Sequence, residues 1–163
     1  MIASPIEWSI ANLSTRMTDT RSPEQRRRIM QSVKAKNTGP EWTVRRLLFA
    51  MGYRYRLHYK KLPGKPDIAM PGRRKAIFVH GCFWHGHDCS KGQLPKSRLD
   101  YWQPKIAATR ERDARNLRSL HESGWETLVL WQCELADRNG LVAKLESFVE
   151  GSQFGRDKTR TRT

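Results

Sequence analysis

The sequence predicts an α/β fold, a mixed central sheet flanked by helices, and two observations support this prediction. Apolar residues first recur at helical spacing and then alternate in three short segments, before a long polar helix and a last strand. That last strand needs a helical crossover to rejoin the sheet, so both parallel and antiparallel neighbours are expected. At 163 residues, the chain is long enough for one domain with tails.

Two helices are expected before residue 52. Residues 22–25 (SPEQ) supply a cap, a proline at the first helical position and a glutamine three residues after the cap. They predict a basic helix within residues 21–37. Residues 38–41 (TGPE) repeat the capping-box spacing, and the apolar positions from Trp42 to Met51 predict a core helix that Gly52 ends.

Three strands should follow. Residues 53–59 alternate aromatic or apolar side chains with basic ones, which is typical of a half-buried strand. Residues 67–70 and 75–80, joined by the turn 71–74 (PGRR), predict a β-hairpin.

The C-terminal half should hold a helix, a strand and a helix. The long polar helix is expected from near Pro104 to Gly124, and it precedes the apolar strand 126–131. A final amphipathic helix is expected over residues 141–149.

The two ends lack such patterns. Residues 1–20 show no sustained period and predict a loosely ordered leader, in which Met17 is as plausible a start as Met1. Residues 151–163 are polar and basic and predict a disordered tail.

The charge balance points to a polyanion partner. Lys and Arg total 31 against 16 Asp and Glu, giving a net charge of +15, which favours nucleic acid. No apolar run approaches the roughly 20 residues that span a bilayer, so no membrane role is expected. Three cysteines cannot all pair within one chain, which predicts a reducing, cytoplasmic setting and suggests bound metal.

Asp67 is the first candidate for chemistry. If the turn pairs Met70 with Lys75, Asp67 lies opposite Phe78 and diagonal to His80 on the same face. A carboxylate at a strand entrance is a ligand that Mg²⁺ prefers. The alternative is an aspartate that only closes the turn before a strand.

A cysteine and histidine group is the second candidate. Cys82, His87 and Cys89 follow a C-x4-H-x-C spacing, and Cys133 follows the last strand as an available fourth ligand. Such a set suits tetrahedral, structural Zn²⁺. Spacing alone leaves open which histidine completes the site: His80, His85 or His87.

The large aromatic residues in the same region allow two interpretations. On a zinc-held loop, Phe83 and Trp84 would project and could stack on bases or wedge between base steps. They could equally cover the sheet, and the same alternatives apply to Trp102.

The remaining polar candidates are less distinctive. His85 could accept a proton near neutral pH if a carboxylate, for which Asp113 is the candidate, oriented its ring. Glu41 is a candidate for holding a water on the metal, although its capping-box position explains it structurally. His58 and His121 lie in no motif and are expected to be structural.

Several segments together carry a family likeness. LPGKPDIAM, then KAIFVHGCFWHGHDC, YW at residue 101, ERD at residue 111 and VLWQCEL at residue 129 closely resemble the very short patch repair (Vsr) DNA mismatch endonucleases. The likeness spans roughly residues 20–150. It implies a restriction-endonuclease-like PD-(D/E)xK variant fold for residues 21–150, in which Phe78 and His80 occupy the usual acidic and lysine positions.

The resemblance also implies roles for individual residues. Asp67 and the carbonyl of Val79 would bind catalytic Mg²⁺, with His80 and Glu41 holding water there. His85, oriented by Asp113, would be the base. Structural Zn²⁺ would be held by Cys82, His87, Cys89 and Cys133. DNA would be entered by Phe83, Trp84 and Trp102, and its backbone would be clamped from the N-terminal helix by Arg26, Arg27 and Arg28.

The activity that the resemblance implies is specific. Such enzymes nick DNA on the 5′ side of the thymine in a T·G mismatch, which arises when 5-methylcytosine deaminates. We therefore expect a monomeric enzyme acting on mismatched double-stranded DNA in the bacterial cytoplasm, associated with the nucleoid. The alternatives are a restriction or homing endonuclease that cuts both strands, and a non-catalytic zinc-containing DNA-binding module.

Overall fold

The computed structural model describes residues 22–32, 36–95 and 98–151. The order of elements is α1 (Pro23–Ser32), α2 (Gly39–Ala50), β1 (Arg56–Leu57), β2 (Ile68–Met70), η1 (Pro71–Arg73), β3 (Lys75–His80), α3 (Leu99–Glu122), β4 (Glu126–Trp131), η2 (Glu134–Ala136) and α4 (Arg138–Glu150). The expected leader and all of the expected tail except Gly151 lie outside these residues. None of the described helices is long and apolar enough to cross a membrane.

The chain divides into two units, residues 1–35 and residues 36–163. The first contains α1, whose predicted cap is present: the backbone N–H of Gln25 donates to the Ser22 hydroxyl, and that of Ser22 donates to the Gln25 side chain. The basic N-terminal helix is thereby confirmed as a local structure.

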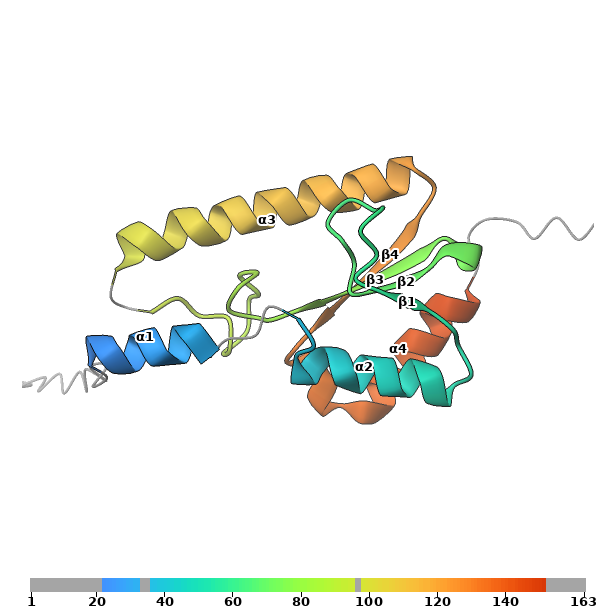
Figure 1. Ribbon diagram of the computed structural model, residues 1–163, viewed down its shortest axis with the longest axis horizontal. Helices are drawn as coiled ribbons and strands as arrows, with labels where there is room; N and C mark the ends of the chain where they lie inside the picture. Colours follow the sequence, from blue (N-terminus) through green and yellow to red (C-terminus); the bar gives the residue numbers. More distant parts are fainter. Residues whose placement is uncertain (1–21, 33–35, 96–97, 152–163) are drawn as a thin grey trace, which may run out of the picture. The chain divides into compact units, whose positions relative to one another are not determined.

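The second unit is built on a four-stranded mixed sheet in the order β1-β2-β3-β4 (Figure 1). The two pairs β1–β2 and β2–β3 are antiparallel, and β3–β4 is parallel. Because α3 connects the two parallel strands, the predicted helical crossover is confirmed. The hairpin register is also as predicted, with Met70 opposite Lys75.

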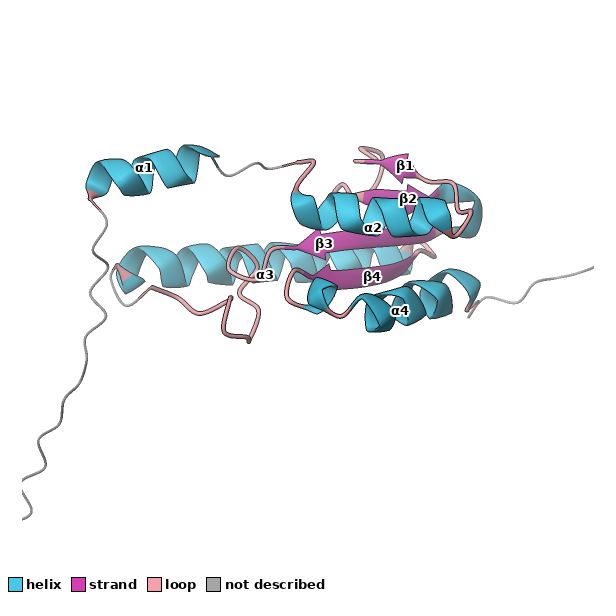
Figure 2. Ribbon diagram, turned by 90° about the horizontal axis from the view of Figure 1, so that it is seen from below, coloured by secondary structure: helices cyan, strands magenta, loops and turns pink. Residues whose placement is uncertain are grey.

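Helices cover both faces of this sheet. Figure 2 shows α2 and α4 on one face and α3 on the other. The main apolar core lies between the sheet and the α2–α4 layer; its buried members include Leu48, Ile68, Ile77, Leu130 and Leu145. The capping box predicted for α2 is present, with Thr38 and Glu41 bonded reciprocally.

Several predicted boundaries were wrong. The strand expected over residues 53–59 pairs only at Arg56–Leu57, because the preceding tyrosines bond elsewhere: the Tyr53 hydroxyl donates to Glu150, and that of Tyr55 donates to the Arg45 carbonyl. Burial alternates only over residues 53–56, because both residues of β1 are exposed, and the hydrogen-bonded ladder is short.

Two helices also begin earlier than predicted. α3 starts at Leu99, so Pro104 lies inside the helix and not at its start. A proline there removes one backbone donor without ending the helix. α4 starts at Arg138 because the Asp137 side chain accepts the N–H of Gly140 and caps it.

Candidate active site and metal centre

Asp67 lies just before β2, beside the C-terminal end of β3. The predicted register places it opposite Phe78, and its carboxylate accepts the backbone N–H of Val79 at 2.8 Å. Burial raises the pKa of Asp67, and the nearby Glu41 carboxylate raises it further, although the Val79 hydrogen bond acts in the opposite direction. A carboxylate in such surroundings is ready to interact with a cation.

Glu41 approaches Asp67 from the start of α2. Ligand atoms of Glu41, His58 and Asp67 lie within 4.8 Å of one another. The buried Glu41 carboxylate accepts the backbone N–H groups of Asn37 and Thr38, together with the Thr38 hydroxyl. The capping role and the position near Asp67 are therefore both present, so the two interpretations of Glu41 do not exclude each other.

Sequence reasoning missed two members of this group, His58 and Arg45. The buried Arg45 guanidinium bonds to Glu41 and to the Asn37 side chain, and it contacts the His58 ring at 3.2 Å. Helical spacing of four residues from Glu41 could have identified Arg45. His58 could have been found from the strand register, because its N–H donates to the Asp67 carbonyl.

A second cluster lies at the C-terminal end of β3 and brings together His80, His85 and Asp113. The Nδ1 atom of His85 lies 2.6 Å from an Asp113 carboxylate oxygen. The His85 ring also stacks on His80, with centroids 3.7 Å apart and planes 7° apart. The predicted contact between His85 and Asp113 is thus present, and α3 supplies the aspartate.

The charge states in this cluster follow from burial and neighbours. Burial lowers the pKa of His80 to about 4, and the adjacent His85 lowers it too, so His80 is neutral near pH 7. Burial raises the pKa of Asp113, but the hydrogen bond from His85 and the charges of His85, His80 and Arg112 together outweigh it, so the net shift is downward. An ionised Asp113 accepts a hydrogen bond from the Nδ1–H group of His85, which leaves Nε2 with a free lone pair.

The two clusters meet at the end of one strand. Asp67 is bonded to the backbone of Val79, and the ring of the next residue, His80, is stacked on His85. The Asp67 carboxylate and the His85 ring therefore each contact one of two consecutive residues of β3, Val79 and His80. That the two side chains act on one phosphodiester stays a prediction.

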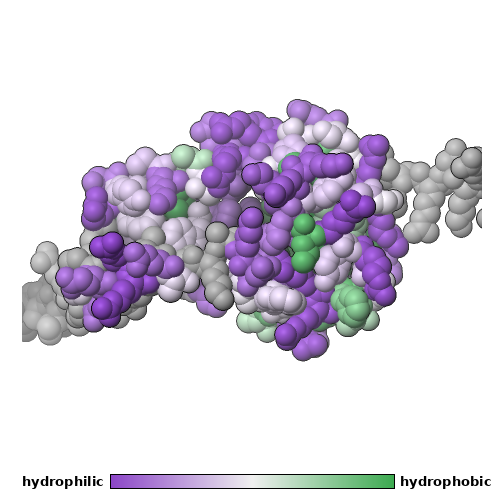
Figure 3. Space-filling view, in the orientation of Figure 1, coloured by the Kyte–Doolittle hydropathy of each residue, from purple (hydrophilic) through white to green (hydrophobic). Residues whose placement is uncertain are grey.

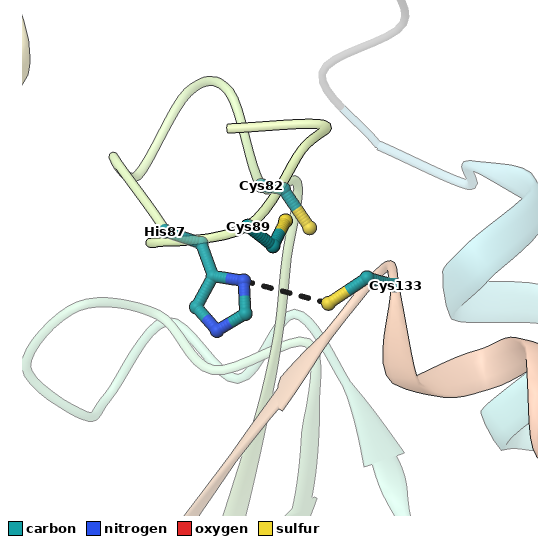
Figure 4. Close-up of side chains that lie close together, drawn as sticks. All are labelled: Cys82, His87, Cys89 and Cys133. Carbon is teal, nitrogen blue, oxygen red and sulfur yellow. Dashed lines mark hydrogen bonds between the residues drawn. The ribbon is translucent and has the colours of Figure 1, made fainter. Parts of the chain in front are cut away.

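The third cluster contains the three cysteines and His87 (Figure 4). Their sulfur atoms and one ring nitrogen of His87 lie within 4.8 Å of one another, and Cys133 Sγ is 3.4 Å from His87 Nδ1. Cys82, His87 and Cys89 come from the loop after β3, while Cys133 follows β4. Of the three histidines that spacing left open, the structure places His87 with the thiols.

The donor set of this cluster fits a tetrahedral metal ion. Three free thiols and an imidazole are the ligands that Zn²⁺ prefers, and tetrahedral ligands at its bond lengths lie roughly 3.5–3.8 Å apart. Burial and the neighbouring thiols raise the pKa of Cys133 to about 11. Burial also opposes ionisation of Cys89, but hydrogen bonds led by that with His87 lower its pKa to about 7. Without a cation, adjacent thiolates repel, so a divalent ion would allow all three to ionise.

The aromatic candidates form one group, in which Phe83 and Trp84 come from this loop and Trp102 comes from α3. Phe83 lies 5.0 Å from Trp84 and 4.9 Å from Trp102, measured between ring centroids. All three are half-buried, and Tyr101 packs on Trp102 at 5.1 Å. These rings neither project separately into solvent nor lie in the core of the sheet. They pack on one another at the surface. In α1, Arg27 and Arg28 are exposed, and the Arg26 side chain is outside the described set.

Comparisons with known proteins decide which family this arrangement belongs to. A sequence model described as DNA mismatch endonuclease Vsr matches residues 18–91. The type II nicking enzyme V.XorIIP of Xanthomonas oryzae pv. oryzae is 59% identical over 136 residues, covering 83% of this chain and 100% of that protein. The DNA mismatch endonuclease Vsr of Escherichia coli is 34% identical, covering 83% of this chain and 90% of that protein.

The chain belongs to the Vsr family of DNA endonucleases. Membership makes it an enzyme that acts on DNA, which favours the catalytic interpretation over a non-catalytic binding module. Among solved structures, the catalytic domain of the homing endonuclease I-Bth0305I matches this Vsr-family chain with a TM-score of 0.46 and 22% identity, covering 69% of this chain and 94% of that one.

Proposed function

We propose that this Vsr-family enzyme is a Mg²⁺-dependent, strand-specific nickase that cuts 5′ of the thymine in T·G mismatches left by 5-methylcytosine deamination. The observation that supports it best involves two neighbouring residues of β3. Asp67 is hydrogen-bonded to Val79, and the His85 ring, paired with Asp113, stacks on His80. The proposal includes a PD-(D/E)xK variant fold for residues 21–150 and action as a monomer.

In this proposal each residue has a defined task. Asp67 and the Val79 carbonyl hold Mg²⁺, which when bound would stabilise negative charge on the phosphate and on the leaving oxygen. His85 Nε2 removes the proton from the attacking water, and Asp113 keeps the ring in the required tautomer. Neutral His80 and Glu41 position water molecules at the site.

The zinc cluster and the aromatic group prepare the substrate. With Zn²⁺ bound to its four ligands, the loop would keep a fixed position relative to β4. Phe83, Trp84 and Trp102 then enter the duplex beside the mismatch. A wobble pair opens more easily than a matched pair, so unstacking costs less there. The arginines of α1, Arg26, Arg27 and Arg28, contact the DNA backbone.

A nicking assay tests the proposal directly. Duplexes labelled on each strand and containing T·G, T·A or C·G at one position are incubated with and without Mg²⁺, with flanking bases varied. We expect one cut, 5′ of the thymine, in the T·G duplex alone. Cleavage of both strands on a denaturing gel would instead indicate a restriction or homing endonuclease, and equal cutting of matched DNA would refute mismatch specificity.

The variant Asp67→Asn separates the chemistry from folding. The amide keeps the shape of the carboxylate and can still accept the Val79 N–H, but it is a much weaker Mg²⁺ ligand. We expect cleavage to fall by roughly 10³-fold or more, because the cation stabilises several kcal/mol of charge in the transition state. Unchanged cleavage by a normally folded variant would remove Asp67 from the mechanism.

A further inference from the structure

The segment between α2 and β2 has an unusual charge. Residues 52–66 contain five cationic side chains and no aspartate or glutamate. All five are exposed, and we refer to the four that precede Leu62, namely Arg54, Arg56, Lys60 and Lys61, together as the basic edge. None of the roles proposed above uses them.

The first two members of the basic edge are held in place by β1. This strand is one of the two edge strands of the sheet, and the preceding Tyr53 and Tyr55 bond with Glu150 and with the Arg45 carbonyl. Because side chains alternate along an extended chain, Arg54 and Arg56 face the opposite way. Their guanidinium groups rest near aromatic rings, Arg54 over Phe49 and Arg56 over Tyr59.

The two lysines lie on a turn with a fixed conformation. The N–H of Leu62 donates to the Tyr59 carbonyl across Lys60 and Lys61. Further along, the backbone at Gly64 adopts a φ of +71° and packs so closely on Phe78 and Asn116 that a Cβ there would lie 3.0–3.1 Å from them. Figure 1 shows this β1–β2 connection reaching toward α3.

The basic edge also adjoins the proposed reaction centre. His58, between its two halves, donates its N–H to the carbonyl of Asp67 at 3.2 Å. Among the residues that the structure describes, no carboxylate forms an ion pair with any member of the basic edge. In Figure 3, the hydrophobic residues are separate spots on a mostly hydrophilic face, which suits an electrostatic partner better than an apolar one.

We propose that the basic edge binds backbone phosphates of the DNA substrate, on the β1 side of the scissile bond. The inference rests on the proposed function for the location of the scissile bond, but not for binding to DNA itself. Unpaired cations on a rigid edge beside the carboxylate cluster would position the duplex without reading its sequence. The contacts would therefore stabilise matched and mismatched duplexes alike.

The salt dependence of binding tests this inference. Binding of fluorescent T·G and T·A duplexes is measured without Mg²⁺ over a range of salt concentrations, for the wild type and for the double variant Lys60→Gln/Lys61→Gln. Each lost phosphate contact makes the slope of log K against log[salt] shallower by about 0.9, so we expect a change of roughly 1–2 for both duplexes. Under nicking conditions, KM should rise while kcat stays unchanged, as expected when ground-state binding is lost.

A charge-matched control separates a local contact from a general field. Arg118→Glu lowers the net charge by the same two units, but on α3. Arg118 lies near the C-terminal end of this helix, where Arg74 of the β2–β3 hairpin donates to the Ser123 carbonyl. This variant should leave the salt slope nearly unchanged. An equal change in both variants, or none in the lysine variant, would overturn the inference.

The same data keep this inference separate from the proposed function. If the wild type does not nick mismatched DNA, the proposed function is refuted. The comparison of salt slopes between the wild type and the variants stays valid. A second variant, Arg54→Gln/Arg56→Gln, should repeat the slope change. Its thermal unfolding is checked because Arg54 also packs on Phe49.

Discussion

At the scale of single residues, the site depends on how neighbours set the state of one imidazole. His85 is a useful base only if its Nε2 atom is unprotonated and points away from its partner. The Asp113 carboxylate at 2.6 Å from Nδ1 fixes that tautomer, while the stacked His80 stays neutral because it is buried. Asp113 is far from His85 in the sequence, whereas His80 lies in the same short segment.

The residue-scale prediction concerns Asp113. Replacing it by asparagine keeps the volume but removes the charge that orients His85, so we expect kcat for T·G nicking to fall by roughly 10²–10⁴-fold. Steady-state and single-turnover rates measure this effect. The control is Asp100→Asn on the exposed first turn of α3, which should nick normally. Equal rates in the two variants would contradict the role of Asp113.

At the scale of elements, the loop after β3 is held by a few long-range contacts. Cys82 is fully buried, His87 stacks on Trp131 of β4, and Cys133 reaches the same point from beyond β4. Gly92 packs against the His87 carbonyl so closely that any Cβ would collide with it. The loop therefore has a defined fold, which the metal ion would complete.

We expect Cys133→Ser to weaken zinc binding and loosen this loop. A serine hydroxyl is a poor zinc ligand, so the ion would lose its only tether to the β4 side. Metal content should fall below one zinc per chain, and hydrogen exchange in residues 81–92 should accelerate. Removing zinc from the wild type with a chelator should accelerate hydrogen exchange in the same residues. A variant that still binds one zinc per chain would contradict the role of Cys133 as a ligand.

The aromatic group gives a second element-scale prediction. Trp102→Ala removes one ring that packs on Phe83, and we expect the preference for T·G over T·A duplexes to weaken by about 1–3 kcal/mol, the contribution of one stacked base. The ratio of kcat/KM values measures it. Trp42→Ala, which removes a 49% exposed tryptophan from α2, should leave the ratio unchanged.

At the scale of the whole molecule, one core joins α2, the sheet and α4, and it positions every cluster indirectly. Leu48 is fully buried in this core, whereas the next residue, Phe49, is 62% exposed. We expect Leu48→Ala to lower the free energy of unfolding by about 2–5 kcal/mol. Phe49→Ala should change it by roughly 0.5 kcal/mol or less.

Chemical denaturation of the zinc-loaded protein compares these two variants. The lower stability of Leu48→Ala should appear as a lower denaturant concentration at the midpoint of unfolding. The dependence of the unfolding free energy on denaturant should stay unchanged, because the same surface is exposed on unfolding. Similar midpoints for both variants would mean that the core between α2 and the sheet is not the main source of stability.

The sequence by itself determined the local structures whose causes are local. Both capping boxes and the hairpin register follow from side chains within a few residues of one another, and all are present. The mixed sheet followed instead from the order of elements along the chain, and it is also present. The motif around residues 77–89 also identified the family, because its residue types and spacing are specific. Boundaries were less well determined, since Pro104 is tolerated inside α3 and the tyrosines before β1 bond outside the sheet.

Only the tertiary structure decided which of several equivalent residues share a site. Spacing could not choose among His80, His85 and His87, since all three lie in one short segment. The crossover through α3 and β4 brings Asp113 to His85 and Cys133 to His87. The same folding brings Arg45 and His58 into the Glu41 cluster, and fixes the basic edge beside Asp67. These contacts join distant segments, and their geometry depends on how helices pack on the sheet.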